Sequence, residues 1–336
     1  MIEQSAPVKS SKHSQIPELK SHLPLPEHIG DENAEKSLYP ALVKVSNLLE
    51  LDLSGNKLSD ISSHHKKGGL AWALHDKVTV RILSLESNRL SGISTLSSSL
   101  SGMKQMRVLN LSRNRIDENS ARDLANAIRE MTRLVELRLD ENCLGKEGTR
   151  LVLTALGDGE HKYLEILGLG RIGIGKKTEK DNDVPWYQGF KSLKSLKELN
   201  LSGNKLGPDG ARDLSTIFSN TSNWNALTRL DLSVNDFFSE GAKILTPTIE
   251  NSISSLESLT HLNLAWNWFE PVGFEIMKNS FRRFKGLKYL NLCGNKFEDQ
   301  HKKYLRDQYE KRICGSADEK RRGSLIGEDE AGELIL

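Results

Sequence analysis

Aliphatic residues recur along this chain in nine versions of one pattern, L-x-x-L-x-L-x-x-N-x-L. In the copy that spans Leu196–Leu206, Leu199 and Leu201 alternate with polar residues. An alternation of period two predicts a short strand with one buried face. The copies begin at Leu48, Val80, Met106, Leu134, Leu164, Leu196, Leu227, Leu259 and Leu287.

An asparagine follows the expected strand in every copy except the fifth, which has Ile172 at that position. An amide side chain both donates and accepts hydrogen bonds, so it can satisfy backbone groups where a strand ends. Stacked copies should therefore hold a buried row of amides. The row consists of Asn56, Asn88, Asn114, Asn142, Asn204, Asn235, Asn267 and Asn295.

Most copies continue into a segment with apolar residues three and four positions apart, such as Gly207–Ile217, which predicts an amphipathic helix. A unit of about 30 residues has room for a strand, a turn, a helix and a return. The pattern resembles the ribonuclease-inhibitor-like class of leucine-rich repeats over residues 38–313. That resemblance implies an α/β fold of about nine repeats, a curved solenoid (horseshoe) with a parallel sheet on its concave side and helices on its convex side.

The ends of the chain differ in composition from the repeats. Residues 1–30 are polar and are predicted to be disordered. Residues 31–313 form the predicted leucine-rich repeat domain, with capping helices over 31–46 and 299–313 that cover the apolar ends of the core. Residues 314–336 are predicted to be a flexible tail.

Composition excludes several classes of protein. The 336 residues are 37% hydrophobic, and they include no run of 18 apolar residues and no secretory signal, so we expect no membrane insertion and a cytoplasmic location. The three cysteines, Cys143, Cys293 and Cys314, lack paired spacing, which indicates a reducing compartment and neither a disulfide framework nor a metal site. A net charge of +2 does not favour nucleic acid as a partner. We also expect no cofactor.

The fifth copy is irregular. It is rich in glycine and is followed by a charged stretch, residues 176–190, that contains Trp186 and Tyr187. One interpretation is local drift that the neighbouring repeats tolerate. The other is a protruding loop in which the two aromatic residues contact a partner.

The repeat register predicts which side chains line the concave face. They include Glu136, Arg138 and Asp140 from the fourth copy and Arg229 and Asp231 from the seventh. Acidic residues outnumber arginines on this face by seven to two, which favours a basic protein partner; alternatively, these positions are simply polar. The acidic residues are Glu50, Asp52, Glu86, Glu136, Asp140, Glu198 and Asp231.

Two tryptophans near the end of the domain have no place in the core. The repeat buries Asn267 and Phe269, so Trp266 and Trp268 should project at the rim, where tryptophan is typical of binding hot spots. The register brings His261, Tyr289 and Phe237 near them as an aromatic patch. The alternative is that the tryptophans pack against a neighbouring loop or the C-terminal cap.

The chain contains no P-loop, zinc-protease, redox or hydrolase motif. Gly168–Gly173 is formally G-x-G-x-x-G, but the repeat register explains it as a strand and a turn. We therefore predict a non-enzymatic, monomeric module that binds a protein through the concave face and the C-terminal rim. The alternatives are a GTPase-activating protein of the leucine-rich repeat type and a secreted bacterial effector that binds a host protein.

The tail carries three short signals, each compatible with a different role. Ser324 follows Lys320-Arg321-Arg322, as in a kinase site, and the acidic segment 327–336 resembles an export signal. Its end, Leu334-Ile335-Leu336, is similar to ligands that PDZ domains bind by strand addition.

Overall fold

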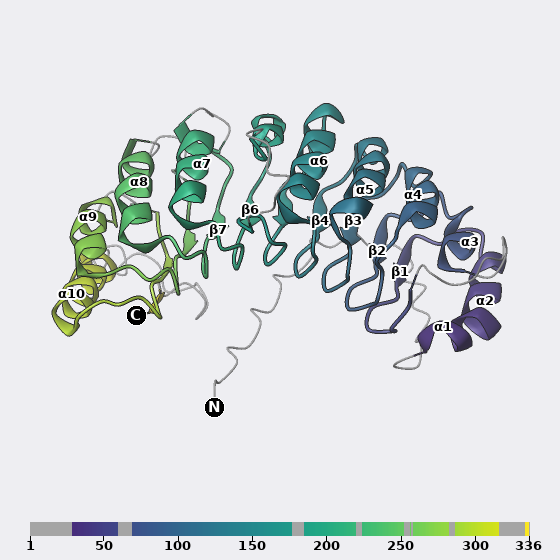
Figure 1. The fold of residues 1–336 in the computed structure, drawn as a ribbon, viewed down its shortest axis with the longest axis horizontal. Helices are drawn as coiled ribbons and strands as arrows, with labels where there is room; N and C mark the ends of the chain where they lie inside the picture. The colour runs from purple at the N-terminus through teal and green to yellow at the C-terminus, as the bar shows by residue number, and fades with distance from the viewer. Residues whose placement is uncertain are drawn as a thin grey trace, which may run out of the picture.

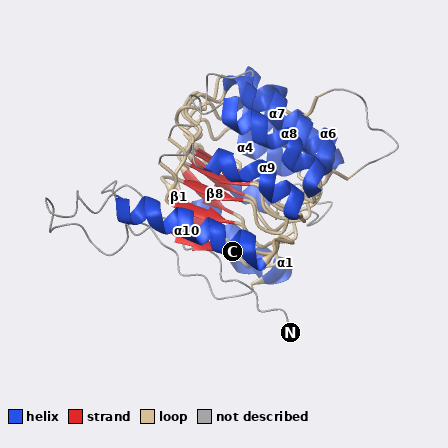
Figure 2. Ribbon diagram, turned by 90° about the vertical axis from the view of Figure 1, so that its left-hand side faces the viewer, coloured by secondary structure: helices blue, strands red, loops and turns tan. Residues whose placement is uncertain are grey.

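A computed structural model of the chain is an arch, with a parallel sheet on its inner side and helices on its outer side (Figures 1 and 2). The structure describes residues 29–59, 69–176, 185–219, 224–251, 256, 258–281, 286–315 and 333–335. Within these residues, the sheet has ten strands in chain order, and all neighbours are parallel. The predicted solenoid is thus confirmed. Among the described residues, no helix is both long and apolar enough to span a membrane.

Each strand contains three residues. The strands are β1 (Glu50–Asp52), β2 (Ile82–Ser84), β3 (Val108–Asn110), β4 (Glu136–Arg138), β5 (Ile166–Gly168), β6 (Glu198–Asn200), β7 (Arg229–Asp231), β8 (His261–Asn263), β9 (Tyr289–Asn291) and β10 (Glu333–Ile335).

The helices connect the strands over the convex side. They are α1 (Gly30–Asn33), η1 (Ala34–Leu38), α2 (Tyr39–Lys44), α3 (Leu70–Leu74), α4 (Ser94–Ser101), α5 (Glu118–Glu130), α6 (Gly145–Asp158), η2 (Gln188–Ser192), α7 (Gly207–Ser219), α8 (Phe238–Asn251), α9 (Pro271–Phe281) and α10 (Asp299–Gly315).

The core lies between the sheet and the helices. The central leucine of each strand from β1 to β9 is buried, and so is the leucine two residues later, as in Leu199 and Leu201 of β6. Helix α5 presents Leu124 and Ile128 to the same core. Burial of such side chains stabilises the fold by about 1.5–3 kcal/mol each.

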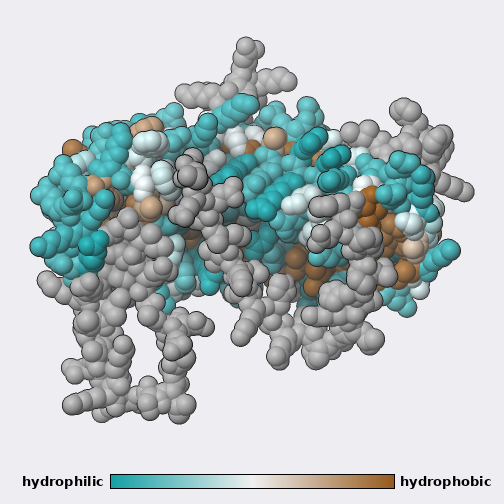
Figure 3. Space-filling model, turned by 90° about the horizontal axis from the view of Figure 1, so that it is seen from below, coloured by the Kyte–Doolittle hydropathy of each residue, from teal (hydrophilic) through white to brown (hydrophobic). Residues whose placement is uncertain are grey.

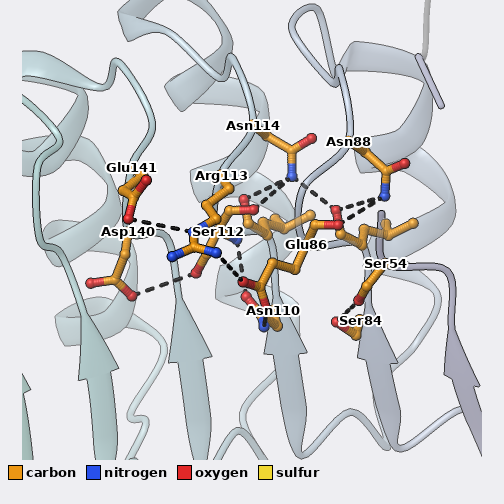
Figure 4. A network of polar contacts seen from close by, with 12 residues as sticks. Ser54, Ser84, Glu86, Asn88, Asn110, Ser112, Arg113, Asn114, Asp140 and Glu141 are labelled. Carbon is orange, nitrogen blue, oxygen red and sulfur yellow. Dashed lines mark hydrogen bonds and ion pairs between the residues drawn. The ribbon is translucent and has the colours of Figure 1, made fainter. Parts of the chain in front are cut away.

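The repeat asparagines form a row at the carboxyl ends of the strands, called here the asparagine ladder (Figure 4). Asn114 is typical: its Nδ2 donates to the carbonyl of Leu85 in the preceding unit (2.9 Å) and to that of Leu111 in its own unit (3.0 Å). Its Oδ1 accepts the N–H of Leu90 (3.1 Å). Each amide thus joins its unit to the one before it.

The ladder is interrupted at Ile172, and Asn204 of the next unit compensates. The Asn204 Oδ1 accepts from the N–H groups of Ile172 (3.0 Å), Gly173 (3.0 Å) and Ile174 (3.4 Å). Its Nδ2 also donates to the carbonyl of Leu169 (2.8 Å). One amide therefore satisfies the turn that has no asparagine of its own.

The fifth unit has the short 3₁₀ helix η2 on its convex side, and an aromatic cluster fills the space there. Trp186, Phe190, Phe218 and Trp224 are all buried, and their neighbouring rings lie 5.5–6.1 Å apart. The indole N–H of Trp186 donates to Asp213 (2.8 Å). The interpretation of Trp186 as a contact residue on a protruding loop is therefore wrong, because its large apolar surface packs in the core. Tyr187 is partly buried against the same core.

The glycines of the fifth strand make room for Asp140. A Cβ at Gly168 would lie 2.0 Å from the carboxylate of Asp140. That carboxylate accepts the N–H of Gly170 (2.8 Å) and the side-chain amide of Asn200 (2.8 Å), so it bridges over β5 to β6. Burial raises the pKa of Asp140, against the effect of these hydrogen bonds.

Both ends of the core are capped. At the N-terminal end, Tyr39 and Leu42 are buried, and the Asp31 carboxylate accepts two hydrogen bonds from Ser59. At the other end, α10 packs against α9 with Leu305 buried and the ring of Tyr304 5.8 Å from that of Phe274.

Two predicted boundaries change. Gly30 begins α1, so it belongs to the N-terminal cap, and residues 1–28 lie outside the described part. At the other end, α10 continues to Gly315, and residues 333–335 form a strand although we predicted a tail over 314–336. Ser324 lies outside the described residues.

We predict that Asn204→Ala destabilises the chain more than Asn114→Ala. Asn204 accepts three backbone N–H groups whereas Asn114 accepts one, and each buried group that loses its partner costs about 1–3 kcal/mol. Urea unfolding followed by circular dichroism should show a loss of about 3 kcal/mol or more for Asn204→Ala. Equal losses in the two variants would contradict the compensating role of Asn204.

Gly189→Ala should also destabilise the fold. Its Cβ would lie 1.8 Å from the carbonyl oxygen of Leu153 in α6, so η2 would have to move away, at a cost of about 1–3 kcal/mol. Gly102→Ala is the matched control, because its nearest contact would be an ordinary 3.4 Å. Thermal unfolding should separate the two variants, and the same melting temperature in both would refute the close packing of η2 on α6.

Candidate protein-binding surface

The outward side chains of the strands form a continuous row across the concave face. In register, the row reads Glu50, Ile82, Val108, Glu136, Ile166, Glu198, Arg229, His261 and Tyr289. All are partly exposed.

We did not predict Ile82, Val108 and Ile166 on this face, because apolar residues were assigned to the core. Their position in the repeat would have identified them. Figure 3 shows apolar surface among hydrophilic surface on this side, toward the N-terminal half.

The acidic excess of the concave face is partly neutralised by arginines. Arg138 pairs with Glu136 (2.5 Å) and Arg229 with Glu198 (3.6 Å). Burial alone would lower the pKa of the Arg138 guanidinium, but nearby carboxylates led by Glu136 raise it above its ordinary value. Arg113 lies between Glu86 (3.8 Å) and Glu141 (3.4 Å), as Figure 4 shows. Three of the seven acidic residues therefore already have a cationic partner.

Two other predicted contact residues, Asp140 and Asp231, form hydrogen bonds within the surface. Asp140 bridges β5 as described above, and Asp231 accepts the N–H and the hydroxyl of Ser233 (2.9 and 2.7 Å). Asp231 also accepts from the side-chain amide of Asn263 on β8 (3.1 Å). These contacts orient the carboxylates and use part of their capacity to accept hydrogen bonds from a partner.

His261 and Tyr289 are adjacent on β8 and β9, as predicted. Their rings stack with centroids 5.7 Å apart and planes at 24°. Burial, together with the charges of Arg229 and Lys288, lowers the pKa of His261, so the imidazole is held toward its neutral form. Arg229, His261 and Tyr289 thus form a strip of planar side chains on the concave face, called here the planar strip.

Trp266 and Trp268 project from the turn after β8 and are 54% and 42% exposed, which confirms their predicted exposure. The ring of Trp266 lies across Gly294 of the next unit, where a Cβ would come within 2.3 Å of it. The indole N–H of Trp268 donates to Asp236 (3.0 Å), and the ammonium of Lys296 lies 5.2 Å from its ring centroid. Both side chains are therefore fixed in place although they are exposed.

Val234 and Phe238 extend this apolar surface and were not predicted. They are 39% and 48% exposed, and their backbone N–H groups donate to the carbonyls of Ala265 and Asn267, which directly precede the two tryptophans. Phe237, which we predicted in the patch, is fully buried because the repeat uses it as the core residue that closes the turn. The residues Val234, Phe238, Trp266 and Trp268 are called here the aromatic rim.

All four residues of the aromatic rim have a positive φ, between 54° and 59°. This left-handed conformation is costly for a side chain, most of all for a β-branched valine. The sixth and ninth copies have Gly203 and Gly294 at the position of Val234 and Trp266. The same conformation recurs at Arg113, Glu141 and Arg171 in other copies, so it belongs to the turn of the repeat.

Over the ranges that the structure describes, no group of three or more His, Cys, Asp or Glu side chains is placed to hold a metal ion.

Comparisons with known proteins agree with the repeat architecture. A leucine-rich repeat family model matches residues 46–61, 192–215 and 255–275, which correspond to the first, sixth and eighth copies. The chain is also 27% identical over 255 residues to the human NACHT, LRR and PYD domains-containing protein 14. That match covers 76% of this chain and 20% of the relative, so the chain spans about a fifth of the relative's length. With its nine sequence copies and parallel solenoid, the chain has the leucine-rich repeat fold.

Proposed function

We propose that this chain is a non-enzymatic interaction module that binds a protein partner through the planar strip and the aromatic rim. The observation that carries the proposal is the pair of tryptophans, which are about half exposed and yet held by Gly294, Asp236 and Lys296. The name of the human relative includes leucine-rich repeat (LRR) domains. Leucine-rich repeat modules commonly bind proteins.

The fixed position of the tryptophans favours binding. A side chain that is already ordered loses little rotational freedom when a partner covers it, and this lowers the cost of association. Tryptophan also buries a large apolar area and is enriched among the residues that dominate binding energies. An exposed apolar cluster rimmed by polar residues is typical of interaction sites.

Several finer features belong to the same proposal. We infer the ribonuclease-inhibitor-like class from units of about 30 residues with helices on the convex side. We also propose a cytoplasmic location, which the unpaired spacing of the cysteines supports. That the protein is a monomer stays a prediction. A basic partner has weaker support than the sequence suggested, because Glu86, Glu136 and Glu198 already pair with arginines.

We predict that replacing both tryptophans, Trp266→Ala with Trp268→Ala, weakens binding of the partner at least about tenfold, since hot-spot residues contribute about 2 kcal/mol or more. Affinity capture with the full chain and mass spectrometry would identify the proteins lost in the double variant. Titration calorimetry with the purified partner would then measure the loss.

Tyr163→Ala is the matched control. Tyr163 is as exposed as Trp266, at 54%. It precedes β5, at the amino ends of the strands, whereas Trp266 follows β8, at the carboxyl ends. This variant should bind as the wild type does. If every captured protein binds the double tryptophan variant with unchanged affinity, the aromatic rim is not the binding site.

A further inference from the structure

We propose that the outer edge of β9 is a strand-acceptor site for extended x-Leu-x-Leu segments, and that residues Glu333–Ile335 of the chain itself occupy it. This site is separate from the aromatic rim. The inference does not depend on the function proposed above.

The C-terminal strand continues the register of the repeats. β10 pairs with β9 in parallel, with Glu333 opposite Tyr289, Leu334 opposite Leu290 and Ile335 opposite Asn291. Glu333-Leu334-Ile335-Leu336 repeats the alternation of Tyr289-Leu290-Asn291-Leu292. Leu334 therefore stands at the position that a buried leucine holds in strands β1 to β9. Residues 333–336 thus match the central part of a repeat.

The backbone of β9 explains why its outer edge accepts a strand. On the side of β8, the Tyr289 N–H donates to the carbonyl of Thr260, and the Asn291 carbonyl accepts from Leu264. Because successive residues of a strand direct their backbone groups to opposite sides, Leu290 and Leu292 direct theirs to the outer edge. Such an edge is a template for another strand. The same alternation makes Glu333 and Ile335 the residues of β10 that donate to β9.

The occupant is an edge strand, so it can be displaced. Within the described residues, β10 is paired on one side only, with β9, whereas β2 to β9 are paired on both sides. Elements with few neighbours open at a small fraction of the free energy of global unfolding. The occupant is also joined to α10, which ends at Gly315, and this covalent link raises its effective concentration at the edge. A competing segment must therefore bind the edge of β9 more tightly than residues 333–335 do, or bind when these residues have left the edge.

The surroundings indicate the kind of partner that fits. A parallel segment with leucine at every second position would place those leucines in register with Leu290 and Leu292. A segment that continues beyond the position of Ile335 passes Cys293, whose carbonyl accepts the N–H of Trp266, and then Gly294, which lies beneath the Trp266 ring. The partner is therefore an extended leucine-rich peptide rather than an amphipathic helix.

The test uses a fluorescent synthetic peptide with the sequence of residues 327–336. It is titrated into the wild-type chain and into the full-length variant Ile335→Pro, in which proline removes an N–H that donates to β9. We expect the peptide to bind the variant at least about tenfold more tightly than the wild type, because the variant leaves the edge open. Equal affinity for both chains, or binding to neither, would overturn the proposal.

Two N-methylated peptides provide the matched control. Methylation at the nitrogen of Ile335 removes a donor to β9 and should abolish binding. Methylation at the nitrogen of Leu334 alters a group that faces away from β9 and should leave binding largely intact. The same loss with both peptides would show that strand pairing is not the mode of binding.

Hydrogen exchange gives a second readout that needs no peptide. The amides of Leu290 and Leu292 should be protected in the wild type and exchange faster in Ile335→Pro, whereas the amide of Tyr289, bonded to β8, should stay protected. Leu334→Lys is a second variant, which places a charge in the leucine register and should have the same effect. Unchanged exchange in both variants would refute the occupied edge.

Discussion

The asparagine ladder is the interaction on which the rest of this structure depends. Each strand contains only three residues, so the chain leaves the sheet soon after it enters. The backbone groups at that exit would be buried without partners, and such groups are costly to leave unsatisfied. The repeat amides supply the partners and connect each unit to its neighbour, as Asn114 does through its bonds to Leu85 and Leu90 of the preceding unit. The turn geometry, and with it the exposure of every rim residue, follows from this constraint.

The fifth unit shows how the solenoid tolerates a departure from the repeat. Asn204 accepts the N–H of Ile172, where the repeat asparagine is missing. Helix η2 and its aromatic cluster stand where other units have an α-helix. The carboxylate of Asp140 fills the space that the glycines of β5 leave open. In a solenoid each unit contacts mainly its neighbours, so a local loss is compensated locally. The unit that first suggested a binding loop is instead a well-packed part of the core.

The two proposed binding features arise from the same register. The ladder requires Asn267 to be buried, and this directs Trp266 and Trp268 outward on either side of it. The parallel sheet leaves β9 with backbone groups directed away from β8, and residues 333–335 pair with them. One end of the arch therefore combines fixed aromatic side chains with a sheet edge, and both are suited to protein recognition.

Much of the fold was predictable because the repeat is a local code. Spacing alone placed the strands, the buried leucines and the amide row, and it predicted that the two tryptophans are exposed. If position in the repeat had been given precedence over residue type, the same spacing would have placed Ile82, Val108 and Ile166 on the concave face. It would also have revealed the alternation in Glu333–Leu336.

Other features depended on contacts between residues far apart in the sequence. Trp186 is buried beside Phe190, whose ring also contacts the distant Trp224, and its indole N–H donates to Asp213. Asp140 is engaged because two glycines allow it to reach Asn200. The pairing of Arg229 with Glu198 and the pairing of β10 with β9 likewise join separate units. The repeat by itself determined which way each side chain points, since that is set by backbone alternation. Only the tertiary structure decided what each side chain meets, because the neighbouring units supply those contacts.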